Sequence, residues 1–386
     1  PGMQLAGDAG YVWVTLQTDS SRQYSNSIAK ITYTSGTTGQ PKGVCLSQQA
    51  IDTVSRSLAS AAGLQQQSRH LAVLPLATLL ENIGGLYAPL LAGGHSQLLP
   101  MQQLGATGSA NRDPQQLYSA IRDSHAHTLI LVPQLLQDLV EQMEPAQLQL
   151  PELQFIAVGG APVSAALLQR AAHLHLPVYE GYGLSECSSV VAVNTPRQYR
   201  RGSVGKPLAH VALEFAEDGE IRVRGATFEG YLHDDTQAHR DYVATGDCGY
   251  LDEDGFLFLT ARKKNMFITA WGRNVAPEWV ERELVLAPAI RQAAVFGEAR
   301  PWNVALLVPA PGCDAQTIDA AIAAVNQTLP DYARISKWLC AEETFSVAND
   351  ELTTTGRLRR SVILTRYGKL IDALYAPTAA TQRKSA

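Results

Sequence analysis

Apolar and polar positions divide the chain into two regions with different patterns. In the first region, short apolar runs alternate with segments in which apolar residues recur at helical spacing. We predict strands at the runs and helices at the segments between them. The expected strands are residues 11–15, 28–33, 71–75 and 128–132, and the expected helices are residues 49–62, 113–123 and 133–143. Residues 154–183 continue with a strand, a glycine turn, a helix and a strand. This alternation indicates an α/β fold with a mainly parallel sheet and flanking helices.

The pattern changes after about residue 203. Residues 211–259 contain short alternating strands separated by turn residues, which indicates a β-rich subdomain. From residue 277 the order is helix, strand, strand, helix, strand, and this order suits a small α+β domain. We therefore predict a large domain of mixed and parallel sheets over residues 1–263 and a small mobile domain over residues 264–386.

Three segments are expected to lie outside the regular elements or to need a separate interpretation. Residues 101–112 are predicted to form an exposed loop, and residues 377–386 a loose tail. The longest apolar region, residues 71–94, is interrupted by Pro75, Glu81, Asn82 and Pro89. We expect no transmembrane segment there, because charge and broken helix are costly in hydrocarbon.

Composition and charge exclude several classes of partner. The chain has 386 residues, 46% of them hydrophobic and 17% charged, and a formal net charge of −5, as in ordinary soluble globular proteins. No long basic run is present, so nucleic acid is not an expected partner. The five cysteines are scattered without CxxC spacing, which favours a reducing, cytoplasmic location over a zinc site or a disulfide framework.

Residues 31–44, ITYTSGTTGQPKGV, suggest a site for phosphate. Glycines bring backbone N–H groups close to an anion, hydroxyls add donors and metal ligands, and the lysine adds positive charge. The segment does not match the usual P-loop, because Lys42 lies between Pro41 and Gly43 and is not followed by serine or threonine. A flexible surface turn is the structural alternative.

The whole string resembles the phosphate loop of the adenylate-forming superfamily, which includes acyl-CoA synthetases, peptide-synthetase adenylation domains and luciferases. Further matching motifs follow in the family's order: GGAP at 159–162, YGLSE at 182–186, GEIRVRGATFEGY at 219–231, TGD at 245–247, ARKKNMFITAWGRNVAPEWVE at 261–281 and NDELTTTGRLRRSVI at 349–363. The resemblance covers nearly all of residues 27–375, and six motifs in order are specific. The chain is most similar to the long-chain fatty acid–CoA ligase branch, so the resemblance implies a role in fatty acid metabolism.

The resemblance implies a two-step reaction. A carboxylate, here a medium- or long-chain fatty acid, attacks the α-phosphorus of ATP, and pyrophosphate leaves an acyl-adenylate (acyl-AMP). Coenzyme A then takes the acyl group as a thioester. Mg²⁺ neutralises charge on the phosphates, and the small domain closes differently for each step to exclude water.

The resemblance also assigns roles to the matched residues. Lys42, Glu186 and Arg357 are the implied catalytic residues, and Thr38 and Glu186 the implied metal contacts. The implied ATP, AMP and coenzyme A contacts are Thr34, Ser35, Gly36, Thr37, Thr38, Gly39, Gly160, Ala161, Pro162, Gly181, Tyr182, Gly183, Ser185, Asp247, Arg262, Lys264 and Gly272. In this scheme Tyr182 stacks on adenine, Asp247 accepts the ribose hydroxyls, and the loop of Gly272 reaches the site for thioester formation.

Each assignment has a purely structural alternative. The alternatives are a core tyrosine for Tyr182, a solvated loop carboxylate for Glu186, a turn cap for Asp247, a surface charge for Arg262, an exposed linker for Lys264 and a buried ring for Trp271.

Four departures from the family pattern concern the chemistry and the extent of the large domain. Arg357 stands where the family has a lysine that bridges carboxylate and α-phosphate, and arginine is larger, planar and forked. Thr78 and Gln48 replace commonly found histidines, although the acyl-site residue Glu81 matches. About thirty residues precede the phosphate loop, where family members carry a long stretch. We therefore expect part of the large domain to be missing, cut away or supplied by another chain, and a lone chain to be unstable or to form a homo-oligomer.

Two other functions remain open from the sequence. The acyl group can pass to an acyl carrier protein instead of coenzyme A, or the protein can be a weakly catalytic or non-catalytic binder of nucleotide or acyl-adenylate. Pyrophosphate exchange over a panel of carboxylates separates an enzyme from a binder, and a comparison of the two thiols identifies the acceptor.

Overall fold

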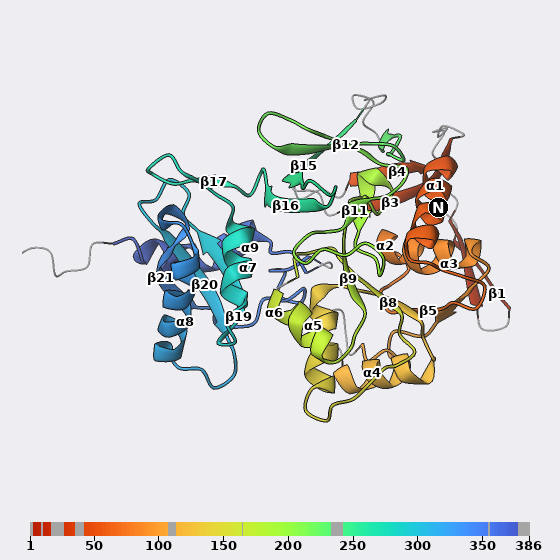
Figure 1. The fold of residues 1–386 in the computed structure, drawn as a ribbon, viewed down its shortest axis with the longest axis horizontal. Coiled ribbons are helices and arrows are strands. Elements are labelled where there is room, and N and C mark those ends of the chain that lie inside the picture. Colours follow the sequence, from red (N-terminus) through yellow and green to blue (C-terminus); the bar gives the residue numbers. More distant parts are fainter. Residues whose placement is uncertain are drawn as a thin grey trace, which may run out of the picture.

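The computed structural model describes residues 3–8, 11–16, 27–34, 42–106, 113–163, 165–232, 242–353 and 356–376. Within these ranges the chain forms a large domain and a small domain that lies beside it, with the small domain at the left of Figure 1. No helix of the described ranges has the length and apolar character needed to cross a membrane.

A seven-stranded sheet forms the centre of the large domain, with the order β11-β10-β9-β8-β7-β5-β6. Its strands are β5 (Arg69–Ala72), β6 (His95–Leu98), β7 (Thr128–Leu131), β8 (Phe155–Val158), β9 (Val178–Tyr182), β10 (Ala192–Val193) and β11 (Lys206–Pro207). Strands β5, β6, β7, β8 and β9 run parallel, and β10 and β11 pair antiparallel at one edge. The carboxyl ends of β8 and β9 therefore lie side by side, and this edge is where ligands bind in open α/β sheets.

Three helices cover one face of this sheet: α4 (Pro114–Asp123), α5 (Pro133–Met143) and α6 (Ala165–His173) (Figure 1). Their apolar residues pack with the parallel strands into one core, in which Leu117, Leu136 and Ile156 are fully buried. Proline is the first residue of both α4 and α5, and Asp113 caps α4 by accepting hydrogen bonds from two backbone N–H groups.

The large domain contains two further antiparallel sheets, a hairpin and several helical segments. A three-stranded antiparallel sheet contains β3 (Ile28–Thr34), β4 (Lys42–Ser47) and β14 (Gly230–Tyr231), and a four-stranded sheet contains β12 (Ala212–Phe215), β13 (Glu220–Arg224), β15 (Val243–Leu251) and β16 (Leu257–Arg262). The remaining elements are the hairpin β1 (Met3–Asp8) and β2 (Tyr11–Leu16), and the helical segments α1 (Gln48–Ala61), α2 (Leu79–Glu81), η1 (Asn82–Tyr87), α3 (Ala88–Leu91) and η2 (Ser185–Cys187).

The small domain has a three-stranded sheet with helices on both faces. Its elements are β17 (Phe267–Ile268), β18 (Asn274–Val275), α7 (Pro277–Val285), β19 (Ile290–Phe296), β20 (Asn303–Pro309), α8 (Ala315–Thr328), η4 (Asp331–Ala333), β21 (Ile335–Cys340) and α9 (Arg360–Ala373). Alternate residues of β19 face opposite sides, so Val295 packs with α7 and α8 while Phe296 packs with α9.

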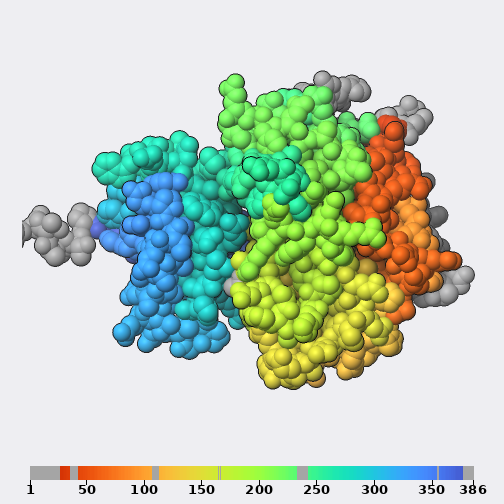
Figure 2. Space-filling view, viewed as in Figure 1, coloured from red at the N-terminus to blue at the C-terminus, as the bar shows by residue number. Residues whose placement is uncertain are grey.

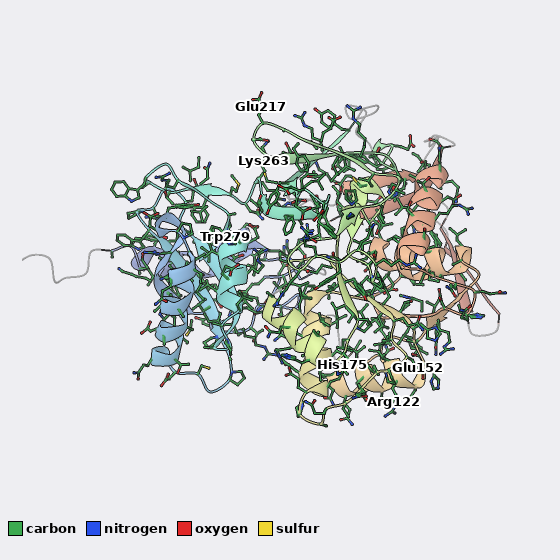
Figure 3. The ribbon with its side chains drawn as sticks, in the orientation of Figure 1. Arg122, Glu152, His175, Glu217, Lys263 and Trp279 are labelled. Carbon is green, nitrogen blue, oxygen red and sulfur yellow. The ribbon has the colours of Figure 1, made fainter. Side chains whose placement is uncertain are left out.

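The two domains are joined through a link that is anchored on the large-domain side. Lys263, labelled in Figure 3, lies just after β16. Its Nζ is 2.5 Å from Asp218 Oδ2 and 3.0 Å from Glu220 Oε2, and its backbone N–H donates to the Gly246 carbonyl.

The structure confirms the expected α/β fold with a β-rich region and a small α+β domain. One local expectation is wrong: residues 101–106 are not an exposed loop, because Leu104 is fully buried in the main core. Residues 107–112, the second half of that expected loop, and residues 377–386, the expected tail, lie outside the described residues.

Candidate active site

A cavity of about 2720 Å³ lies between the two domains and extends into the large domain. Figure 2 shows the narrow cleft that separates the small domain from the large one on the side facing the viewer. Gly160 and Tyr182 line the cavity from the sheet edge, and Arg262, Lys264 and Arg357 line it from the link and from the small domain. Such a space is larger than a typical ligand pocket, which has roughly 300–1,000 Å³, and it can accept several reactants together.

The end of β9 brings an aromatic ring and a carboxylate together. The side chain of Tyr182 is buried, and its hydroxyl donates a hydrogen bond of 2.8 Å to Asp247 Oδ2. Arg262, opposite Asp247 in the β15–β16 pair, places its Nε 3.6 Å from Asp247 Oδ1. Burial is the main cause that raises the pKa of Tyr182 well above its usual value, so the hydroxyl stays protonated and donates.

Glycines allow the backbone to approach closely on both sides of Tyr182. A Cβ added to Gly183 would lie 1.7 Å from the Ser189 carbonyl oxygen, so no side chain fits there. Gly160 has φ of +88°, which favours glycine, and it begins the turn that contains Ala161 and Pro162 after β8. Gly181 lines the cavity on the other side of Tyr182.

Arg357 extends from the small domain to this turn. Its Nε donates a hydrogen bond of 2.7 Å to the Gly160 carbonyl oxygen. Solvent reaches the side chain from the cavity, yet desolvation by the surrounding protein, followed by the charge of Arg262, lowers the pKa of Arg357. Asp247, Tyr182 and Glu278 oppose that shift, which shows that the guanidinium lies close to the Tyr182–Asp247 pair.

Lys264 is the third cation of this group. Desolvation lowers its pKa, and the charges of Arg262 and Arg357 add to the effect, while Asp247 and Glu278 oppose it. Three cations therefore share one end of the cavity with few carboxylates, and this arrangement favours an anionic ligand.

A second group lies where the phosphate-loop segment leads into β4. Lys42, the first residue of β4, places its Nζ 4.9 Å from the centre of the Tyr231 ring. The Tyr231 hydroxyl donates a hydrogen bond of 2.8 Å to Glu186 Oε1. Thr34 lies opposite Lys42 in the β3–β4 pair, and Ser185 lines the cavity beside Glu186. The other predicted loop residues, Ser35, Gly36, Thr37, Thr38 and Gly39, lie outside the described residues.

The donor set near Glu186 suits Mg²⁺ better than a metal held by protein alone. Among the described residues, no group of three or more histidines, cysteines, aspartates and glutamates could hold a metal ion. Mg²⁺ is usually held through one or two carboxylates together with substrate phosphates and water. One carboxylate at Glu186, close to Lys42 at the end of the segment for which a phosphate site is predicted, fits that mode.

Gly272 is not brought to the cavity. It lies at the tip of the β17–β18 hairpin with φ of +71°, and no cavity-lining residue comes from this tip. Trp271 beside it is 77% exposed and donates its Nε1–H to the Pro301 carbonyl oxygen, so the alternative of a buried ring is wrong.

Glu81, which matched the acyl-site region of the sequence, is fully buried and bound by protein groups. Its Oε1 lies 2.7 Å from His70 Nε2, and its Oε2 accepts a hydrogen bond of 2.9 Å from the Leu74 N–H. A Cβ added to Gly85 would lie 1.9 Å from Glu81 Oε1, so the wide helical turn of η1 requires glycine there. Glu81 thus fixes this segment, and Thr78, Leu79 and Leu80 line the cavity.

Sequence reasoning assigned no role to Tyr231 and Glu278. Tyr231 ends the GEIRVRGATFEGY segment, so the signal was present without a stated function. Glu278 accepts a hydrogen bond from Asn265 in the link and lies near Arg357 and Lys264. No local pattern distinguishes this glutamate from Glu281 and Glu283 on the same helix.

Glu180, also on β9, gives the fold a pH dependence. Its side chain is 9% exposed, its Oε2 has no hydrogen-bond partner in the described part of the chain, and burial raises its pKa from 4.5 to about 7. The charges of Arg282 on α7 and of Arg201 oppose the shift, and the Tyr199 ring lies close by. The native state therefore holds this proton more tightly than the unfolded state does.

We expect this proton to stabilise the fold fully below pH 4.5 and the benefit to be lost as the pH rises through about 7. The loss is about 3 kcal/mol at most, from 1.36 kcal/mol for each pKa unit. The Tm of Glu180→Gln relative to the Tm of the parent should rise by several degrees between pH 5 and pH 8, as measured by thermal unfolding of both proteins. Glu217→Gln, at an exposed position labelled in Figure 3, is the control. A constant difference between parent and Glu180→Gln over that range would contradict the prediction.

Comparison with known proteins identifies the family. The AMP-binding enzyme family matches residues 4–232, and the AMP-binding enzyme C-terminal domain matches residues 264–379. The long-chain-fatty-acid–CoA ligase FadD15 of Mycobacterium bovis is 37% identical over 246 residues, which cover 56% of this chain and 41% of the relative. The 2-succinylbenzoate–CoA ligase of Bacillus velezensis is 33% identical over 297 residues, which cover 71% of this chain and 57% of the relative.

Among solved structures, the anthranilate CoA ligase AuaEII in complex with anthranoyl-AMP has a TM-score of 0.79 at 21% identity, covering 92% of this chain and 70% of that chain. At this identity the likeness shows the fold alone. The chain spans about half the length of the two curated relatives. The resemblance to the adenylate-forming superfamily and to its fatty-acid branch is confirmed, and ligases for an aromatic acid match as well. On these matches, which span both domains, the chain belongs to the AMP-binding enzyme family.

Proposed function

We propose that the protein activates a carboxylic acid with ATP and transfers the acyl group to coenzyme A. The acid in this proposal is a medium- or long-chain fatty acid, and the intermediate is an acyl-adenylate. Support for the acid comes from the fatty-acid ligase relative and from the apolar side chains of Leu79 and Leu80 in the cavity wall. The aromatic-acid ligases among the relatives make an aromatic carboxylate the competing substrate class.

In the first step, one carboxylate oxygen attacks the α-phosphorus of ATP. The new bond forms between that oxygen and phosphorus, and the bond to the bridging oxygen of pyrophosphate breaks. In the proposal the cationic group of Arg357, Arg262 and Lys264 offsets the negative charge of the reacting carboxylate and α-phosphate. Lys42 and the N–H groups of the loop hold the leaving pyrophosphate. Mg²⁺, when bound beside Glu186, supplies charge neutralisation on the phosphates.

In the second step, the thiol gives its proton to water, its sulfur bonds to the acyl carbonyl carbon, and AMP leaves with the electron pair of the broken C–O bond. The Tyr182 ring and the Asp247 carboxylate keep the AMP part in place in this scheme. Tyr182 presents an aromatic surface to adenine, and Asp247 accepts from the ribose hydroxyls.

The hydrogen bond from Arg357 Nε to the Gly160 carbonyl carries the proposal. It means that the small domain contributes a cation to the end of the large-domain sheet, beside the Tyr182–Asp247 pair. A protein that only binds nucleotide has no need of a cation supplied across a domain boundary, whereas the attack of one anion on another needs it.

ATP–pyrophosphate exchange tests the proposal on the full chain. The acid panel contains medium- and long-chain fatty acids, anthranilate and 2-succinylbenzoate. We expect exchange that depends on a fatty acid, and thioester formation after coenzyme A is added. Exchange with aromatic acids alone would change the substrate class, thioester formation with an acyl carrier protein alone would change the acceptor, and nucleotide binding without exchange would overturn the enzyme assignment.

Lys42→Ala is expected to raise the KM for ATP by about tenfold to a hundredfold, with the KM for the carboxylic acid nearly unchanged. An ammonium–phosphate contact is charge-assisted and is worth roughly 1.5–3 kcal/mol. Initial-rate kinetics with each substrate varied in turn gives both constants. Lys206→Ala is the matched control, because Lys206 Nζ also lies 4.9 Å from an aromatic ring, that of Phe256. Parent-like kinetics for ATP in Lys42→Ala would count against the assignment of the loop.

A further inference from the structure

Tyr231 connects two charged groups that the sequence assigned to different motifs. Its hydroxyl donates to Glu186 Oε1 at 2.8 Å, and its ring centre lies 4.9 Å from Lys42 Nζ. Within the described part of the chain, Glu186 Oε2 has no hydrogen-bond partner of its own. The tyrosine therefore binds one oxygen of the carboxylate and leaves the other oxygen for a ligand.

The backbone fixes Tyr231 in this place. Tyr231 lies opposite Val44 in the β14–β4 pair, and the Leu232 N–H donates to the Gly43 carbonyl at 2.6 Å. Phe228 packs edge-on against the Tyr231 ring with the centroids 5.0 Å apart, and its N–H donates to the Glu186 carbonyl at 2.8 Å. The segment 228–232, which includes β14, thus holds the backbones of both Glu186 and Gly43, the residue next to Lys42.

The two contacts differ in chemistry. A phenol hydroxyl that donates to one carboxylate oxygen fixes the rotamer of Glu186. An ammonium over a ring face is attracted by the ring quadrupole whether or not the ring carries a hydroxyl. Removing the hydroxyl should therefore affect Glu186, and removing the ring should affect Lys42 as well.

We propose that Tyr231 is a positioning residue that sets the spacing between the magnesium-binding carboxylate of Glu186 and the phosphate-binding ammonium of Lys42. The inference rests on the proposed function, since it assumes that a nucleotide with magnesium binds between the two groups. Its consequence is specific: the hydroxyl governs the response to magnesium, and the ring governs the affinity for the phosphates.

The test measures ATP binding to the full chain by titration calorimetry, first without magnesium and then at increasing magnesium chloride. Tyr231→Phe is expected to raise the magnesium concentration that gives half of the affinity gain by about tenfold, because a hydrogen bond to a charged group is worth about 1.5–3 kcal/mol. Affinity without magnesium should stay at the parent value. In the Glu186→Gln background, Tyr231→Phe should cause no further shift, as expected for two residues that act together.

Tyr231→Leu is expected to weaken ATP binding without magnesium to the level of Lys42→Ala, and to cause no further loss in a protein that already carries Lys42→Ala. Tyr250→Phe is the matched control, because Tyr250 is exposed and stacks on Phe258 away from the cavity. Thermal unfolding checks the fold. If Tyr231→Leu does not fold, the comparison of Tyr231→Phe in the parent and in the Glu186→Gln background still tests the inference.

A parent-like magnesium midpoint in Tyr231→Phe, or additive effects in the Glu186→Gln background, would overturn the inference while the proposed function stands. Equal losses with and without magnesium would also overturn it and would indicate a packing role alone. If the parent fails to bind ATP at any magnesium concentration, the proposed function itself is wrong.

Discussion

Replacing Arg357 with alanine is expected to lower ATP–pyrophosphate exchange by about 10²–10³-fold, the usual cost of removing one preorganised electrostatic group from a reaction site. The reason lies in the position of the guanidinium. Its Nε is bound to the Gly160 carbonyl, and the charges of Asp247 and Arg262 act on it. The residue therefore stands where the carboxylate and the α-phosphate are expected to meet.

Measuring the two half-reactions separately shows whether Arg357 acts in adenylate formation. Arg357→Ala should spare thioester formation from a preformed acyl-adenylate, because the attack of one anion on another has then already occurred. Arg357→Lys keeps the charge without the planar fork and should retain most of the exchange. Arg359→Ala, two residues further along and paired with Asp350, serves as the control and should behave like the parent. Exchange by Arg357→Ala at the parent rate would rule out the assignment.

The largest expected loss of stability comes from Glu281→Ala. Arg360 Nη2 lies 2.6 Å and 2.7 Å from the two carboxylate oxygens of Glu281, and the exposed fractions of the two side chains are 17% and 9%. Arg360 also donates to the Val295 carbonyl, and Glu281 accepts from the Val295 N–H. Because the variant leaves a buried guanidinium with only the more distant Glu278 carboxylate, at 3.9 Å, we expect the free energy of unfolding of the small domain to fall by about 3–5 kcal/mol.

Chemical denaturation followed by circular dichroism measures this loss, with the transition of the small domain as the readout. The double variant Glu281→Leu with Arg360→Met removes both charges and should recover much of the stability, since well-packed apolar residues often replace a buried ion pair. Asp123→Ala breaks the exposed pair with Arg122 and should leave the denaturation midpoint almost unchanged. A loss in Glu281→Ala no larger than in Asp123→Ala would contradict a structural role for the buried pair.

The sequence predicted the central strands β7 and β8 well because they are buried on both faces, whereas the exposed edge strand β6 was not predicted. Short apolar runs such as TLILV and FIAV, with turn residues on both sides, are too short for a buried helix and indicate buried strands. Two-residue strands such as β10, β11 and β14 were not predictable, because two residues carry no period. Leu104 was missed for a related reason: one leucine in a polar segment gives no sign that the chain turns back to bury it.

The grouping of Gly160, Tyr182 and Asp247 was predictable as a motif set, and the structure supplies the physical cause. The first two residues lie at the ends of adjacent parallel strands, and the third is joined to Tyr182 by a hydrogen bond. The Arg357–Gly160 contact depends on how the two domains sit, which no local pattern states. Tyr231 was missed because its role comes from pairing with a strand almost 190 residues away in sequence.

The anchored lysine at the end of β16 has a consequence for how the enzyme would switch between its two steps. Two carboxylates and one backbone carbonyl bind Lys263, so this residue belongs to the large domain. Any swivel of the small domain must then start at Lys264 or beyond. Such a rotation would move Arg357 away from Gly160 and would change the position of the exposed Trp271 hairpin relative to the large domain. Arg262 would stay beside Asp247 in both steps.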